Sequence, residues 1–184
     1  MRAAFAALVM LVLLTTGCTS GTEEADPDAP GIVPTSTPDP KATAIADLSE
    51  PEFEGVVIDP FDLEAGDCFN TYIWRDRAQN LQRATTRVGC QRNHQAEAYL
   101  ISEHPAPVDQ PYVGDAELKA FTQEVCFENF EDFVGLEYVR SALEIRFLYP
   151  DLQSWNTEDA RTVLCYLEAW EGGLLRGSMA GVEL

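Results

Sequence analysis

The residues of this chain with the most specific chemistry are its five cysteines and two histidines. Four of the cysteines, Cys68, Cys90, Cys126 and Cys165, lie in the C-terminal two thirds of the sequence. Residues 1–17 have the pattern of a signal peptide, as described below, and an even number of cysteines in an exported protein indicates disulfides. We therefore predict two bridges among these four. Four cysteines allow three pairings, and each closure is worth roughly 3–4 kcal/mol. Loop entropy therefore does not distinguish the pairings.

The expected local geometry favours one pairing. Residues 68–74 are β-branched and aromatic, which predicts a strand, and residues 82–90 could return antiparallel after a turn near Gln79. Cys68 and Cys90 would then lie opposite each other on neighbouring strands, at a distance that a disulfide accepts. This leaves Cys126, on the apolar stripe of a predicted helix, to pair with Cys165 in the last predicted strand.

A zinc site is the alternative use of the same residues. Cys90 and His94 have a ligand-like spacing, and Cys68 could contribute a third ligand. Zinc thiolate sites belong mainly to reducing compartments, however, and the chain contains no Cys-x-x-Cys pair. We therefore expect neither a metal nor any other cofactor.

His94 and Glu97 are the residues that could form an acid–base pair. On a helix they would share a face, but on the strand that residues 94–101 predict they would point to opposite faces. We therefore predict that His94 makes hydrogen bonds near the Cys68–Cys90 bridge and serves the fold. His104 lies in a proline-rich loop, and we predict no catalytic residue.

The N-terminus predicts export and lipid anchoring. Residues 1–17 combine Arg2, an apolar run over residues 3–14 and small residues before Cys18, which is the pattern of a signal peptide. The run is too short to span a bilayer, which takes about 20 apolar residues. The ending at Leu14–Cys18 resembles a bacterial lipobox, which implies an acyl chain such as palmitate on Cys18.

The charge balance narrows the classes of partner. The chain has 31 acidic and 12 basic residues, a net charge of −19, which argues against nucleic acid and against a polybasic contact with lipid. We therefore expect the N-terminal lipid to be the membrane contact. Residues 18–51 are rich in Pro, Thr and acid, which predicts a disordered tether.

Residues 52–184 predict one domain. The apolar positions between Asp115 and Val134 recur every three or four residues, which predicts a helix with Asp115 as its N-cap. Alternating patterns predict further strands at residues 143–149 and 162–170, with a loop at 150–159. The order of these elements predicts an α+β fold: an antiparallel sheet with one main helix packed on a face, and two disulfides.

Five blocks carry a resemblance to a known family. They are Gly66-Asp67-Cys68-Phe69, Val88 to Glu97 with Cys90 and His94, the mid-helix Cys126, Ser154-Trp155 followed by Arg161 and Cys165, and Gly177-Ser178. In this order, over residues 60–181, they resemble the actinobacterial septum formation domain. The chain departs from that pattern at Ala160, which separates Asp159 from Arg161. The resemblance implies a cell-envelope protein linked to division, and implies no known reaction.

Two functions remain open at this level. The first is a non-enzymatic, lipid-anchored binding or adaptor domain on the outer face of the cytoplasmic membrane, whose partner is an envelope or division protein or wall glycan. The second is an enzyme that acts on wall glycan through paired carboxylates. A shallow surface with an exposed Trp155 or Trp170 would favour the first function. A cleft with two close acids, one with a raised pKa, would favour the second.

Overall fold

The computed structural model describes residues 29–33, 52–158 and 160–184. Cys18, the expected signal peptide and most of the expected tether lie outside the described residues. The strands are β1 (Gly31–Val33), β2 (Val56–Ile58), β3 (Cys68–Arg75), β4 (Leu81–Val88), β5 (Ala96–Glu103), β6 (Leu143–Leu148), β7 (Thr162–Ala169) and β8 (Leu174–Arg176). The helices are α1 (Asp115–Val134) and α2 (Leu152–Thr157), with single 3-10 turns η1 (Pro60–Asp62) and η2 (Tyr138–Arg140). In the described residues no helix is both long and apolar enough to cross a membrane.

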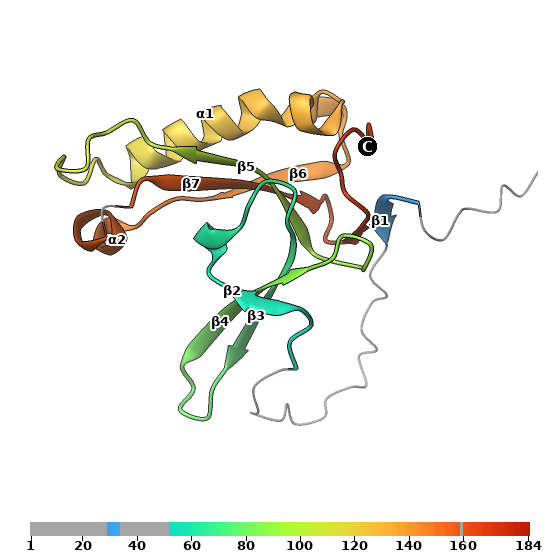
Figure 1. Ribbon diagram of the computed structural model, residues 1–184, viewed down its shortest axis with the longest axis horizontal. Coiled ribbons are helices and arrows are strands. Elements are labelled where there is room, and N and C mark those ends of the chain that lie inside the picture. Colours follow the sequence, from blue (N-terminus) through green and yellow to red (C-terminus); the bar gives the residue numbers. More distant parts are fainter. Residues whose placement is uncertain (1–28, 34–51, 159) are drawn as a thin grey trace, which may run out of the picture.

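Six of the strands form one antiparallel sheet in the order β2-β4-β3-β5-β7-β6. Helix α1 lies along one face of this sheet, over β5, β7 and β6 (Figure 1). Strands β1 and β8 form a separate two-stranded ladder. The predicted α+β fold with one main helix is confirmed.

Helix α1 has the predicted bounds but a different cap. Its N-cap is Gly114, which offers no side chain, and Asp115 is the first helical residue. Asp115 instead accepts a hydrogen bond from the Tyr112 hydroxyl. The helix ends at Gly135, which adopts a left-handed conformation with φ 83° and donates its N–H to the Glu131 carbonyl. The prediction of an Asp115 cap is therefore wrong.

The core lies on both faces of the sheet. Strand β7 shows why: Cys165, Leu167 and Ala169 face α1, whereas Leu164 and Tyr166 face the other side. On the α1 side they pack with every fourth helix residue, a stripe that includes Cys126, Phe130 and Val134. The smaller cluster on the opposite face includes Leu63, which directly follows η1. The sheet is thus buried on both faces along its central strands.

Both predicted disulfides are present. Cys68 bonds to Cys90 with a Cα–Cα distance of 5.2 Å, and Cys126 bonds to Cys165 with a Cα–Cα distance of 5.5 Å. The expected register is wrong by two residues, because Cys68 lies opposite Val88 and β4 ends there. Cys90 reaches Cys68 from the turn that follows. The second bridge joins α1 to β7, as predicted.

Two short elements differ from the sequence-based expectation. Residues 152–157, expected in a loop, form α2, whose N-cap Asp151 accepts a hydrogen bond from the Ser154 N–H at 2.8 Å. Residues 31–33, expected within the disordered tether, form β1 and pair with β8. Each segment is too short for a periodic pattern to show, so only its contacts reveal it.

The helix-to-sheet disulfide should contribute measurably to stability. Replacing both Cys126 and Cys165 by alanine releases a closure of 39 residues, for which we expect a loss of about 4 kcal/mol in the free energy of unfolding. Urea unfolding of the oxidised protein measures this. The matched change at Cys68 and Cys90, a closure of 22 residues, should cost slightly less. A loss below about 1 kcal/mol for the first pair would contradict this account.

Candidate functional site

A buried polar cluster lies where β3 and β5 meet. Cys68 and Glu97 are direct partners across these two strands. His94 precedes β5 and joins its backbone to that of Leu175, with N–H to carbonyl distances of 2.9 and 2.7 Å. A sulfur, an imidazole nitrogen and a carboxylate oxygen from Cys68, His94 and Glu97 all lie within 4.8 Å of one another. The three side chains are no more than 1% exposed.

The prediction that His94 and Glu97 point to opposite faces is wrong. It rested on a strand that includes both residues, whereas β5 begins at Ala96. The alternation of a strand therefore does not apply between positions 94 and 97. The chain bends at Gln95, between His94 and the start of β5, and the side chains of His94 and Glu97 both enter the same buried cluster.

The C-terminal segment supplies the hydrogen-bond donors to the buried carboxylate of Glu97. The Ser178 hydroxyl donates to one oxygen at 2.6 Å, and the Met179 backbone N–H donates to the other at 2.5 Å. Burial raises the pKa of Glu97, and these two hydrogen bonds oppose the rise. The sequence contained a signal for this contact in the Gly177-Ser178 block, but nothing local connects that block to Glu97.

The imidazole of His94 is fixed in one tautomer. Its Nδ1 lies 2.8 Å from the Arg92 carbonyl oxygen and must donate to it, which leaves the lone pair on Nε2. This buried Nε2 has no hydrogen-bond partner among the described residues. Burial lowers the pKa of His94, so the ring is neutral at neutral pH.

The donors do not complete a zinc site in the disulfide form. A neutral histidine fixed through its other nitrogen is well suited to bind a metal. The thiolate of Cys68 is nevertheless consumed by its bond to Cys90, and both Glu97 oxygens accept hydrogen bonds. The cluster in this form is a buried hydrogen-bonding centre.

The second histidine lies in a different part of the core. His104 follows the other end of β5, and its ring contacts the rings of Phe121 and Trp155 at centroid distances of 4.8 and 5.5 Å. Its Nδ1 accepts from the Ala106 N–H at 3.2 Å. Trp155 is itself only 1% exposed and donates its indole N–H to the Gln110 carbonyl. The structure therefore does not bring His94 and His104 together.

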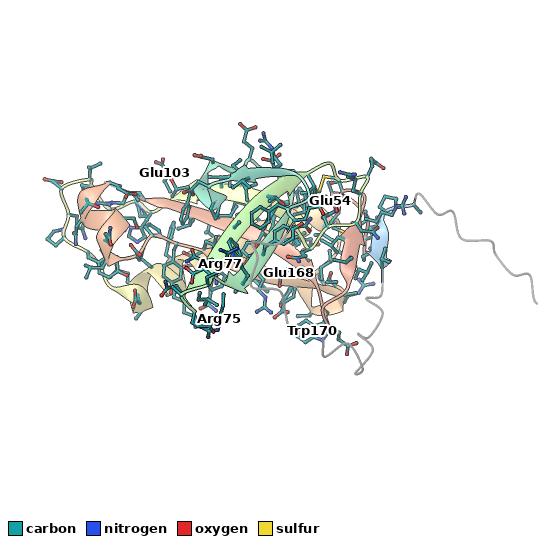
Figure 2. The ribbon with its side chains drawn as sticks, turned by 90° about the horizontal axis from the view of Figure 1, so that it is seen from below. Glu54, Arg75, Arg77, Glu103, Glu168 and Trp170 are labelled. Atoms are coloured by element: carbon teal, nitrogen blue, oxygen red, sulfur yellow. A yellow bond between two sulfur atoms is a disulfide. The ribbon has the colours of Figure 1, made fainter. Side chains whose placement is uncertain are left out.

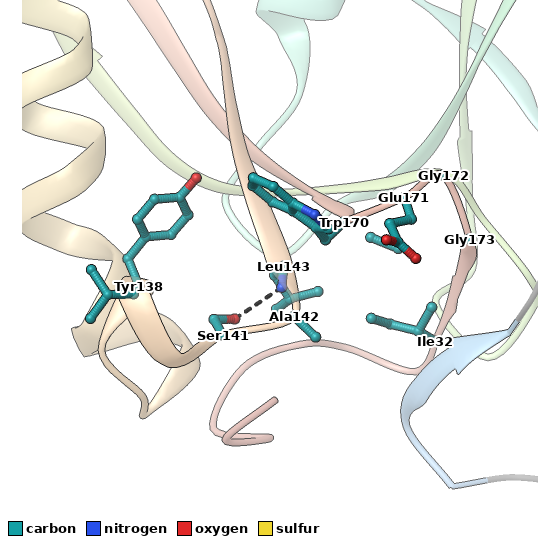
Figure 3. A pocket seen from close by; sticks show the side chains of 11 residues that line it. Ile32, Tyr138, Ser141, Ala142, Leu143, Trp170, Glu171, Gly172 and Gly173 are labelled. Carbon is teal, nitrogen blue, oxygen red and sulfur yellow. Dashed lines mark hydrogen bonds between the residues drawn. The ribbon is translucent and has the colours of Figure 1, made fainter.

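An apolar pocket of about 800 Å³ opens on the surface where β6 begins and β7 ends. Figure 3 shows Tyr138 and Ile32 on opposite sides of it, with Trp170 between them. Trp170 is 55% exposed and Val139, also in the lining, is 81% exposed. Of the two tryptophans considered from sequence, Trp170 is therefore the one that solvent reaches.

The rim of this pocket is a tight turn between β7 and β8. Glu171 and Gly172 both adopt positive φ angles, 70° and 81°. At Gly173 a Cβ atom would lie 2.6 Å from Cγ2 of Ile32, so the absence of a side chain there allows β1 to approach. Strand β1 is thus part of the pocket wall.

A family model described as "Septum formation" matches residues 65–178. Comparisons with curated proteins and with solved structures found no match. The matched range begins three residues before Cys68 and ends at Ser178. It therefore includes Cys68, His94, Glu97 and Ser178, all members of the buried polar cluster.

Substitutions at Glu97 should separate its charge from its hydrogen bonds. In Glu97→Gln the amide can accept from the Met179 N–H and donate to the Ser178 hydroxyl, whereas Glu97→Ala leaves both without a partner. We expect Glu97→Ala to lose at least about 2–3 kcal/mol in the free energy of unfolding.

The pH dependence of stability shows whether ionisation of Glu97 stabilises or destabilises the fold. Because the folded pKa of Glu97 is raised, its favourable contribution is complete below the ordinary value of 4.5 and is lost as pH rises through the folded pKa. Glu97→Gln should therefore gain stability relative to the parent protein between pH 4 and pH 7. His94 is present in both proteins, so only the change in its interaction with residue 97, within 4.8 Å, adds to this difference. Urea unfolding at several pH values measures this, and parallel pH profiles would contradict it.

Proposed function

The chain belongs to the septum formation family, and from that premise we propose that it is a lipid-anchored, non-enzymatic binding domain of the cell envelope that acts in septum formation or wall assembly. Its place is the outer face of the cytoplasmic membrane. Its partner is an envelope or division protein that presents an apolar segment. The matched range of the family covers most of the folded domain, which supports a role for the domain as a whole.

The observation that carries this proposal is the exposed apolar pocket. Its volume of about 800 Å³ lies within the range of sites that hold small ligands or side-chain anchors. Trp170 and Val139 remain exposed although both have apolar side chains. Aromatic residues that are half exposed at a hollow are typical anchors of protein interfaces. An apolar protein segment suits this lining better than a glycan, which needs many hydrogen-bonding groups.

The buried polar cluster supports a structural role for the residues that first suggested chemistry. The oxygens of Glu97 are occupied by Ser178 and Met179, and the carboxylate has no exposed surface. A wall glycan could not reach it without local opening of the fold. The alternative, a carboxylate-dependent enzyme that acts on wall glycan, therefore gains no support from Glu97, and we do not adopt it.

Cross-linking in living cells tests the binding proposal. A photo-reactive phenylalanine analogue at position 170 should form a discrete adduct with an envelope or division protein. The matched control is position 152, because Leu152 on α2 is 56% exposed, as Trp170 is 55% exposed, but lies away from the pocket. The same adducts from both positions, or adducts with glycan alone, would contradict the proposal.

The functional cost of losing Trp170 should exceed its structural cost. Because its side chain is half exposed, we expect Trp170→Ala to change the free energy of unfolding by less than about 1 kcal/mol while impairing septation. Thermal melting and a complementation assay measure the two effects. Normal septation with Trp170→Ala would remove the pocket from the proposal.

Lipid anchoring depends on Cys18 alone in this proposal. We expect Cys18→Ala to move the protein from the membrane fraction to the soluble fraction at high ionic strength. Cell fractionation with immunoblotting measures this. A variant that stays with the membrane as firmly as the parent would show that another feature anchors the chain.

A further inference from the structure

The outer part of the β3–β4 hairpin projects from the sheet. Strand β5 pairs with β3 only at Cys68 and Phe69, and β2 pairs with β4 only between residues 85 and 87. Beyond these positions the two strands pair only with each other, as far as Arg75 opposite Leu81. Figure 1 shows this hairpin extending away from the layer of β5, β6, β7 and α1. A two-stranded hairpin is marginally stable on its own, so a projecting one needs a reason.

The two faces of the projecting hairpin differ. On one face, Phe53 packs on Tyr72 and Trp74 with ring centroid distances of 5.1 and 5.3 Å. The other face, which we name the hairpin face, carries Ile73, Arg75, Leu81 and Arg83. Ile73 lies opposite Arg83 and Arg75 lies opposite Leu81, so aliphatic and cationic side chains alternate along and across the strands.

All four side chains of the hairpin face are exposed. Ile73 is 55% exposed and Leu81 is 64% exposed. Arg75 and Arg83 are exposed as well, and Arg77 is exposed in the adjoining turn. Figure 2, viewed toward the hairpin tip, shows Arg75 and Arg77 close together there.

The hairpin carries a net positive charge, opposite in sign to that of the whole chain. Residues 68–92 contain five of the twelve basic residues and a single acidic residue, Asp76, in a protein of net charge −19. Arg87 and Arg92, nearer the base, pair with Asp67 and Glu54. None of the ion pairs among the described residues involves Arg75, Arg77 or Arg83.

The one acidic residue is occupied within the turn. The carboxylate of Asp76 accepts hydrogen bonds from the backbone N–H groups of Ala78 and Asn80, both at 2.9 Å, and from the Gln82 amide at 2.9 Å. These bonds lower the pKa of Asp76 and shape the turn that presents Arg77. Asp76 therefore stays ionised, and the three arginines outnumber this single negative charge at the tip.

We propose that the hairpin face docks on the anionic phospholipid surface of the membrane. The guanidinium groups of Arg75, Arg77 and Arg83 bind lipid phosphates, and Ile73 and Leu81 enter the headgroup region. Guanidinium matches phosphate oxygens in a bidentate way, and a basic group near an anionic membrane gains about 1 kcal/mol. The proposal rests on the envelope location in the proposed function, but not on the pocket.

The aliphatic residues favour a membrane over a soluble polyanion. Arginines alone would suit a phosphate-bearing wall polymer equally well. Ile73 and Leu81 gain nothing from such a polymer, whereas a lipid interface accepts apolar side chains interleaved with basic ones. The acidic remainder of the domain is repelled by the same lipids, which orients the hairpin toward the membrane. The overall charge of −19 argued against a basic contact with lipid, but that value sums over the whole chain and does not show the local excess of arginine in the hairpin.

Vesicle co-sedimentation tests the proposal without the lipid anchor. The protein is residues 18–184 with Cys18→Ser, and the vesicles are phosphatidylglycerol with phosphatidylcholine in equal parts, or phosphatidylcholine alone. We expect binding to the anionic vesicles only, and loss of that binding in 0.5 M salt. Arg75→Gln combined with Arg83→Gln should weaken binding by about 25-fold, from two groups of about fivefold each.

Two further variants complete the test, and all variants are first shown to melt like the parent. Ile73→Ser with Leu81→Ser should weaken binding several-fold, whereas Lys119→Gln, an exposed cation on α1, should leave it unchanged. Equal binding to neutral vesicles, or parental binding by the arginine variant, would overturn the proposal. The proposal would also be overturned if the parent protein binds soluble polyphosphate and the Ile73→Ser, Leu81→Ser variant binds vesicles as the parent does. That result would identify a phosphate-bearing wall polymer as the ligand. The cross-linking result at position 170 is independent of all these outcomes.

Discussion

The fold depends on where the buried carboxylate of Glu97 finds its donors. A carboxylate with no exposed surface is costly unless hydrogen bonds compensate it. Its donors come from Ser178 and Met179, more than 80 residues further along the chain, so the C-terminal segment must lie against Glu97. The backbone pairing of His94 with Leu175 fixes the preceding strand, β8, in the same place. The buried carboxylate of Glu97 and the neighbouring His94 thus determine where β8 and the residues that follow it lie.

This constraint links the buried cluster to the surface pocket. The turn at Trp170–Gly173 forms the pocket rim and leads directly into β8. Strand β8 pairs with His94 through Leu175 and with β1 along its length. A second anchor lies at the other end of β7. There Arg161 stacks on the Trp155 ring at 3.5 Å and donates to carbonyls of the loop that follows β5, including Pro107 and Val108. The blocks that carry the family resemblance therefore correspond to these two structural anchors and to the Cys126–Cys165 disulfide.

Sequence reasoning succeeded where the determining contacts are local. The period of apolar residues predicted the extent of α1 but not its cap. The expected hairpin predicted the Cys68–Cys90 bridge in spite of a register error of two residues, and the Cys126–Cys165 bridge followed by elimination. It failed where distant contacts decide. The entry of His94 into the cluster depends on its pairing with Leu175, and β1 exists only because β8 lies beside it. The role of Ser178 was equally invisible, since its partner is 81 residues away.

The docking of β1 also changes the mechanics expected of an anchored domain. Residues 18–51 taken as a free tether would separate the lipid from the domain by up to about 115 Å. Because Gly31–Val33 pairs with β8, only residues 18–30 separate a lipid on Cys18 from the domain, and these extend at most about 45 Å. That distance is comparable to the size of a domain of this length. A domain held so closely can reach the same membrane with a projecting hairpin. In the proposed arrangement the short segment from Cys18 to β1 and the cationic hairpin act together. The segment raises the local concentration of lipid at the domain, and the hairpin selects the orientation in which the pocket is presented.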